Sequence, residues 1–476
     1  MTTACALSRG YSFAGAPPSA RPAVHRGITL LWKEAAVIAI VLGLLTTGRY
    51  AEAFVMGGLI VWACLGTHRA LQSLSLSVIV VMANQDVTGE QSGVGLLKWL
   101  LVCVALARVL ADSRDQPPTR PAWAVWFGLF FVIALGLVFF ENRNPLLSVM
   151  KLVTFSAGAL AALIGMRNQR YPPQYWLNWF TTVYAVVLAL SVPLIFVPSG
   201  YLTGAPWFRG ITAQSQTFGV YIAPLVAYLA VELFRRPRTV IFPLTGLAAY
   251  CLFLSGCRTA FMAAGTALVA AIACLVIFRQ NRRKIPGNRY LALLLCAAAA
   301  LIGSVVILRG ASLGEDLLNF LVKSQWDLSA PVFSNTGVGA SRVSQVNQLV
   351  NSIADHPVFG IGFGLGPADA DQVIELDEVT GLPTGAPSEQ GFLPLAVLVQ
   401  VGMVGAAVLL VMVLVLVYPV AKCGDPTILA LLLAALLVNF GEMVFFAIGG
   451  LGIQMWLLVG LCHEAGCRSR QEPART

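Results

Sequence analysis

The sequence predicts an all-α fold, a polytopic integral membrane helix bundle, and two features of its composition lead to this fold class. Of the 476 residues 58% are hydrophobic and only 11% are charged, whereas a soluble domain carries roughly 25% charged residues. A disordered chain would be poor in aliphatic residues and rich in charge, so disorder is excluded as well. Apolar runs of roughly 16–25 residues recur along the chain, and each approaches or exceeds the length needed to cross a bilayer.

The apolar runs predict about 12–14 transmembrane helices. The expected segments are 28–48, 51–66, 70–84, 92–111, 122–140, 146–166, 176–198, 214–234, 239–256, 258–278, 289–308, 391–420, 427–447 and 448–463. The third segment is short, and the last two could form one broken helix. Residues 309–390 are the only long polar segment between them.

The distribution of arginine and lysine predicts which side each connection occupies. With the N-terminus inside, 21 basic residues fall in inside segments and 7 in outside segments. This asymmetry favours a cytoplasmic N-terminus and a cytoplasmic C-terminus. The predicted organisation is a cytoplasmic tail (1–27), N-terminal transmembrane helices (28–308), a periplasmic loop with short amphipathic helices (309–390), C-terminal transmembrane helices (391–463) and a cytoplasmic tail (464–476).

The net charge of +9 is explained by this topology, so it does not indicate a nucleic-acid partner. The ten cysteines fall almost entirely in predicted spans or on the inner side, without the spacing of a zinc site or of a disulfide framework. We therefore predict no metal site and no cofactor.

The outer loop carries three recognisable patterns. A helix is expected near 312–321 and a second near 341–353, where apolar residues share one face and Pro357 would end the helix. Residues 360–366 contain four alternating glycines, which indicates a hinge or a tight turn. The acidic stretch 369–378 is more typical of a solvated loop than of a metal-binding pair.

Two arginines on the predicted outer face are candidate anion ligands. Arg209 lies shortly before the helix expected at 214–234, and Arg258 lies in a tight turn at the start of the helix expected at 258–278. Free N–H groups at a helix start favour an anion, and a guanidinium binds a phosphate with two hydrogen bonds. The alternative is that each arginine reaches a lipid headgroup. Arg342 could be a third anion contact or a solvated side chain.

Other polar residues lie in expected spans, where charge is costly. For Lys98 and Lys151 we expect contacts with backbone carbonyls or with a water-filled cavity. Glu442 and Asn439 could form a buried polar pair or mark a proton path.

Two residues on the predicted outer side could act as a general base. His356 precedes Pro357, and a histidine titrates near neutral pH; a histidine that merely satisfies a turn is the alternative. Glu389 lies just before the helix expected at 391–420. Its carboxylate could stabilise the helix through the dipole at the N-terminus, or it could face the outer cavity and act as a base.

Several segments together resemble the O-antigen ligase/polymerase superfamily of bacterial envelope proteins. Asp355 to Gly364 is similar to the family's glycine-rich motif in the outer loop. The helix that follows contains a similar glycine pattern at 402–405. Ser255 to Ala260 is similar to the family's arginine-containing turn, and Arg209 to Gln216 to an arginine-led approach to a helix. These segments cover roughly residues 205–410, and the arrangement of about a dozen spans with one large outer loop also matches.

The resemblance implies a metal-independent membrane glycosyltransferase of the bacterial inner membrane. Such an enzyme takes a glycan from an undecaprenyl-pyrophosphate carrier and transfers it to an acceptor hydroxyl. Arg209 and Arg258 would then hold the pyrophosphate. The possible partners of such an enzyme are membrane lipid, a chain-length regulator and a flippase.

One departure from the family pattern bears on the reaction. The ligase branch carries a histidine near the end of the outer loop, but residues 386–390 contain none. This favours a polymerase of O-antigen or exopolysaccharide repeat units, with Glu389 as the matching base and His356 in reserve. The alternatives are an O-antigen ligase acting on lipid A–core or another acceptor, and a multi-pass transporter in which Lys98, Lys151 and Glu442 line a path.

Overall fold

The computed structural model describes residues 30–48, 50–88, 94–114, 121–141, 144–203, 206–237, 239, 241–278, 343–367 and 391–471. In these ranges the chain forms fifteen α-helices and no β-strand. They are α1 (Trp32–Leu44), α2 (Ala51–Cys64), α3 (Thr67–Val81), α4 (Gln85–Thr88), α5 (Val94–Ser113), α6 (Ala122–Glu141), α7 (Pro145–Arg167), α8 (Pro173–Ser191), α9 (Ser215–Arg235), α10 (Ile241–Leu254), α11 (Arg258–Phe278), α14 (Val343–Asp355), α15 (Leu393–Cys423), α16 (Pro426–Leu437) and α17 (Leu451–Gln471). Short 3-10 turns follow α8 and α16, namely η1 (Val192–Phe196), η2 (Pro198–Gly200) and η6 (Val438–Phe440).

Six described helical segments are long and apolar enough to cross a membrane. They are Ala122–Phe139, Pro145–Arg167, Pro173–Phe196, Ser215–Arg235, Arg258–Leu275 and Leu393–Cys423. Shorter apolar helices at Ala51–Cys64, Ile241–Leu254 and Pro426–Phe440 accompany them. The predicted all-α, polytopic membrane fold is confirmed.

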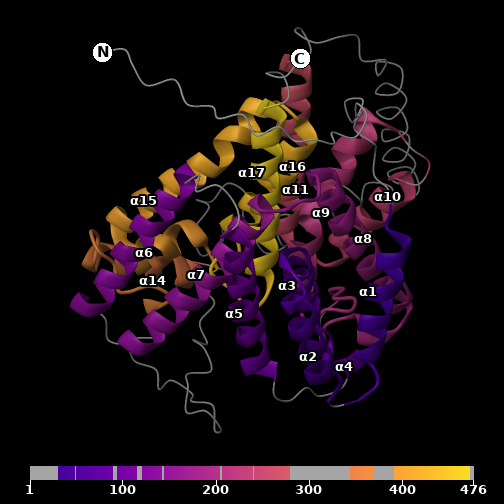
Figure 1. The fold of residues 1–476 in the computed structure, drawn as a ribbon, viewed down its shortest axis with the longest axis horizontal. Coiled ribbons are helices and arrows are strands. Elements are labelled where there is room, and N and C mark those ends of the chain that lie inside the picture. The colour runs from indigo at the N-terminus through magenta and orange to yellow at the C-terminus, as the bar shows by residue number, and fades with distance from the viewer. Residues whose placement is uncertain are drawn as a thin grey trace.

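α17 lies in the middle of the bundle, with two groups of helices around it (Figure 1). It packs against α7 and α15 on one flank and against α16 and α3 on the other. Phe155 of α7 is fully buried in the interior and its ring contacts Phe130 of α6, Trp456 of α17, Phe363 and Phe446. Aromatic side chains therefore join the central helices to two segments outside the helices.

Within the described residues the predicted helices agree with the observed ones to within a few residues at most ends, and the main difference lies near the C-terminus. The segment 427–447 was expected to be one helix, but α16 ends at Leu437, η6 continues to Phe440, and α17 begins only at Leu451. Asn439 explains the break, because its side-chain oxygen accepts a hydrogen bond from the backbone N–H of Phe445 (2.9 Å). We call residues 438–450 the linking turn. α17 also continues past the expected end at 463.

The amphipathic helix expected near 341–353 is α14, which ends at Asp355, two residues before the proline. The helices expected at 289–308 and 312–321, the acidic stretch 369–378 and the predicted tail 1–27 lie outside the described residues.

The ends of the helices meet in the two sets that the charge distribution predicts. In the set predicted to be inside, Arg235 pairs with Asp425 (2.7 Å), and Arg468 donates to the carbonyl of Gln169 (3.0 Å). In the set predicted to be outside, Asn84 donates to the carbonyl of Ser199 (2.8 Å). The contacts agree with the predicted alternation of helix directions, and the assignment of one face to the cytoplasm stays a prediction.

Gln85 and Arg170 provide a test of that assignment, because both are exposed and belong to opposite sets. In a background free of the ten native cysteines, we expect a membrane-impermeant maleimide to label Gln85→Cys in intact spheroplasts. Arg170→Cys should be labelled only after the membrane is opened. The reverse pattern would contradict the predicted orientation.

Candidate functional site

Arg209 lies in a tightly folded loop between η2 and α9. Its backbone N–H donates to the carbonyl of Gly200 (2.8 Å), and the following Gly210 has a φ of +55°. The preceding Phe208 is fully buried, with its ring against those of Tyr201 and Phe218. The loop is thus held by backbone hydrogen bonds and by a buried aromatic side chain.

The guanidinium of Arg209 is buried and paired. The residue is 7% exposed, and its Nη2 forms an ion pair with the carboxylate of Asp86. Its Nη1 donates to the carbonyl of Ala213 (3.4 Å). Arg209 lies in the loop that leads into α9, which begins at Ser215, close to the expected residue 214, and its role as an anion ligand stays a prediction.

The sequence interpretation missed the segment that carries Asp86, because it extended the preceding transmembrane helix to Asn84. α3 instead ends at Val81, and Asn84 is fully buried. Its side-chain amide donates to the carbonyls of Ser199 (2.8 Å) and Gly210 (3.1 Å). The polar run from Asn84 to Asp86 directly after an apolar helix was the available signal.

Arg258 is the first residue of α11, as predicted. It follows a turn in which Gly256 has a φ of +65° and packs directly against the ring of Trp207. The backbone N–H of Phe208 donates to the carbonyl of Leu254 (2.9 Å). The structure therefore brings the Arg209 loop and the Arg258 turn into direct contact.

The glycine-rich motif forms a second feature of the side predicted to be outside. We call residues 357–366 the glycine loop. Gly360, Gly362 and Gly364 all have positive φ values, of +71°, +115° and +77°, a conformation that glycine adopts without a steric penalty. The tight turn predicted from the sequence is confirmed.

The glycine loop docks onto a kink in α15. Gly402 has non-helical backbone angles there, with φ 63° and ψ −172°. The N–H groups of Ile361 and Gly362 donate to the carbonyls of Val399 and Gln400 (2.8 and 3.0 Å). In the other direction, Met403 N–H donates to the carbonyl of Pro357 (3.0 Å). The loop satisfies backbone groups of α15 that the kink releases.

Polar side chains from two helices hold the same loop. Ser148 of α7 donates to the carbonyl of Phe363 (2.7 Å) and Lys151 donates to the carbonyl of Gly364 (2.6 Å). The side-chain oxygen of Gln400 accepts from the N–H of Gly364 (2.9 Å). The expectation that Lys151 contacts backbone carbonyls is confirmed.

The linking turn joins the glycine loop to the arginine segments. Gly441 lies directly against the side chain of Thr259, next to Arg258. Two residues further on, the sulfur of Met443 accepts a hydrogen bond from the amide of Gln400 (3.5 Å). Glu442 lies between these two contacts and is partly buried. Asn439 has a structural role, because it caps the turn.

His356 is exposed at the C-terminal end of α14. Its backbone N–H donates to the carbonyl of Ser352, and its carbonyl accepts from Gly360 N–H (3.0 and 3.1 Å), so it joins α14 to the glycine loop. Arg342 and Glu389 lie outside the described residues. In the described part of the chain, no three His, Cys, Asp or Glu side chains gather as they would around a metal ion.

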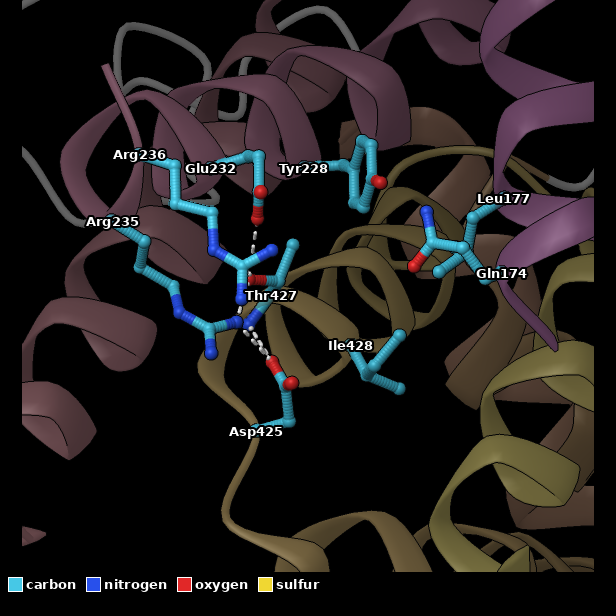
Figure 2. A pocket seen from close by; sticks show the side chains of 9 residues that line it. All are labelled: Gln174, Leu177, Tyr228, Glu232, Arg235, Arg236, Asp425, Thr427 and Ile428. Atoms are coloured by element: carbon cyan, nitrogen blue, oxygen red, sulfur yellow. Dashed lines mark hydrogen bonds and ion pairs between the residues drawn. The ribbon is translucent and has the colours of Figure 1, made fainter. Parts of the chain in front are cut away.

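A cavity at the opposite end of the bundle has a different character (Figure 2). Arg235 of α9 donates to Asp425 and to the hydroxyl of Thr427 (2.7 and 2.6 Å), and that hydroxyl donates to Glu232 (3.4 Å). Asp425 also caps α16 through the N–H of Thr427. Two acidic and two basic residues line the cavity, the second basic one being Arg236. Its charges balance, and these contacts tie the end of α9 to the start of α16.

Part of the chain matches a known protein family. Residues 243–410 match the family model described as O-Antigen ligase. The match confirms the resemblance of this part of the chain to the O-antigen ligase/polymerase superfamily, whose members act in polysaccharide biosynthesis. It includes Arg258, His356, the glycine loop and the kink at Gly402, whereas Arg209 lies outside it. No curated protein matches the chain.

The kink leads to a stability prediction. Gly402→Ala should destabilise the protein by about 1–3 kcal/mol from backbone strain alone, and more because a Cβ would overlap the backbone carbonyl of Val358. Gly128→Ala is the matched control, since it is helical with nothing within 4 Å of a Cβ and should be neutral or stabilising. Thermal unfolding of the detergent-solubilised proteins checks this. Equal midpoints for the two variants would contradict the docking of the loop.

Proposed function

We propose that this protein polymerises undecaprenyl-pyrophosphate-linked glycan repeat units at the outer face of the bacterial inner membrane. One observation carries the proposal. The Arg209 loop and the Arg258 turn touch through the Phe208–Leu254 hydrogen bond, and Arg258 begins a helix within the segment that matches the family model. Two guanidinium groups on adjoining segments suit a pyrophosphate, which offers several anionic oxygens to bidentate donors.

The chemistry of glycan transfer assigns roles to these groups. The acceptor hydroxyl oxygen forms a bond to the anomeric carbon of the donor sugar, and the bond from that carbon to the phosphate oxygen breaks. The bonding electrons pass to the departing pyrophosphate, whose added negative charge Arg209 and Arg258 stabilise. The N-terminus of α11 adds the positive end of the helix dipole. No metal ion takes part in this scheme.

The proton of the acceptor hydroxyl needs a base. Glu389 is our first candidate because it occupies the position where the ligase branch carries its histidine. His356 is the second, because it joins α14 to the glycine loop at the exposed side of the docked loop. A base within hydrogen-bonding reach of the hydroxyl raises the rate by roughly 10²–10⁴-fold.

Polymerisation and ligation differ only in the acceptor. The absence of histidine from residues 386–390 favours a polymerase, whereas the description of the matching family model favours an O-antigen ligase as the second candidate. A polymerase would work with a flippase that delivers repeat units and with a chain-length regulator, and both are proposed partners.

The glycan profile of a deletion strain distinguishes the two candidates. Loss of a polymerase leaves single repeat units on the final acceptor. Loss of a ligase leaves long chains on the lipid carrier and none on the acceptor. An unchanged profile of all surface polysaccharides would overturn both.

The arginines lead to a first activity prediction. Arg258→Ala should abolish chain elongation, and Arg258→Lys should impair it because the bidentate fork is lost. Arg209→Ala should have the same effect. Since Arg209 is buried in an ion pair, membrane abundance and thermal stability are measured in parallel. Full-length polymer in both alanine variants would contradict the pyrophosphate assignment, and wild-type activity of Arg258→Lys would indicate that charge alone suffices.

The base leads to a second activity prediction. Glu389→Gln should slow glycan transfer by roughly 10²-fold or more while leaving donor binding intact. His356→Asn, made in parallel, should have the smaller effect. In-vitro elongation with saturating lipid-linked donor provides the measurement. An unchanged rate in Glu389→Gln, with a slow His356→Asn, would move the role of the base to His356.

A further inference from the structure

Arg209 and its ion-pair partner Asp86 differ in their exposure to solvent. The side chain of Arg209 is 9% exposed, whereas that of Asp86 is 53% exposed. The guanidinium therefore depends on the carboxylate for a counter-charge, while the carboxylate can be solvated by water without the guanidinium. An ion pair of this kind can exchange its exposed member for another anion that approaches from the same side.

A network of hydrogen bonds holds Asp86 beside Arg209. The backbone N–H of Asp86 donates to the side-chain oxygen of Asn84 (3.1 Å), and the amide of the same Asn84 donates to the carbonyls of Ser199 and Gly210. Asn84 N–H donates to the carbonyl of Ile211, and Ala213 N–H donates to that of Met82 (2.8 and 2.7 Å). The Asp86 segment and the Arg209 loop are thus fastened along their backbones.

The need of Arg209 for a counter-charge affects how the anionic group of a donor would bind. Removing the counter-charge of a buried guanidinium is strongly unfavourable, so Arg209 needs an anion beside it before a donor binds. A carboxylate supplies it with one negative charge. A pyrophosphate carries more charge and more acceptor oxygens, and it binds the fork with two hydrogen bonds.

We propose that Asp86 is the exchangeable counter-ion of Arg209. It keeps the guanidinium in position while no donor is bound, and the pyrophosphate of the donor takes its place. Asp86 is therefore a positioning residue that also sets donor affinity, because every binding event includes the loss of its ion pair. This inference rests on the proposed function, in which Arg209 contacts the pyrophosphate.

The test measures binding of inorganic pyrophosphate to the purified full-length protein in detergent, at low ionic strength, by calorimetry. Asp86→Asn keeps an oxygen that accepts a hydrogen bond but removes the charge, so we expect pyrophosphate to bind roughly 3- to 10-fold more tightly than to the wild type. A merely structural role of Asp86 would give weaker binding, because the loop would loosen. Thermal unfolding without ligand verifies that the variant is folded.

Gln85→Lys is the matched control. It changes the net charge by the same amount as Asp86→Asn, by adding a positive charge at the neighbouring exposed position of α4 instead of removing the negative charge of the ion pair. We expect an effect below about 2-fold, since an exposed charge is largely screened by solvent. An equal gain in both variants would show a general field effect and would overturn the exchange of the counter-ion.

Arg209→Gln separates failure of this inference from failure of the proposed function. Binding that is lost in Arg209→Gln but unchanged or weaker in Asp86→Asn would overturn the role of Asp86 and keep the pyrophosphate assignment. Binding unaffected by Arg209→Gln would overturn both. Tighter binding in Asp86→Asn, together with its loss in Arg209→Gln, supports both.

Discussion

The end of the bundle that holds the candidate site depends on the need to satisfy backbone hydrogen-bonding groups inside an apolar helix. α15 is long and apolar enough to cross a membrane, and its kink at Gly402 releases backbone groups that lipid could not satisfy. The glycine loop supplies the missing partners. Gly360 lies so close to residues 399–402 that a Cβ would meet their backbone atoms at 2.5–2.7 Å. The kink and the loop therefore require each other, and glycine is needed on both sides.

This mutual requirement determines the geometry of the candidate site. The buried ring of Phe363 lies in the aromatic cluster around Phe155, so the glycine loop cannot shift without disturbing the centre of the bundle. Gly364 of the loop is hydrogen-bonded to Gln400, and Gln400 is hydrogen-bonded to Met443 of the linking turn. In the same turn, Gly441 lies against Thr259, the neighbour of Arg258. A continuous set of contacts thus connects the loop that follows His356 to the turn that carries an arginine.

Hydropathy and charge predicted most of the fold because membrane spans obey strong local rules: an apolar run of sufficient length becomes a helix. The prediction failed where a polar side chain competes for backbone hydrogen bonds. Asn439 ends a helix inside an apolar run by accepting from Phe445 N–H, and Asn84 follows the end of α3 at Val81. Neither break contains proline. Local propensity alone does not show whether an asparagine in an apolar run faces a neighbouring helix or the backbone of its own segment.

The site was predictable in its parts but not in its pairings. The sequence indicated the arginine turn, the tight glycine turn and the glycine pattern at 402–405 as separate features, and it indicated that Lys151 would seek carbonyl groups. It could not indicate that the glycine loop binds the kink or that Arg209 pairs with Asp86, because these partners are brought together only by the folded chain. A buried arginine demands a counter-charge wherever it lies. For such a residue, the acidic side chains of the same predicted face are therefore the first candidates to examine, and Asp86 is one of the few acidic residues near a predicted outer helix end.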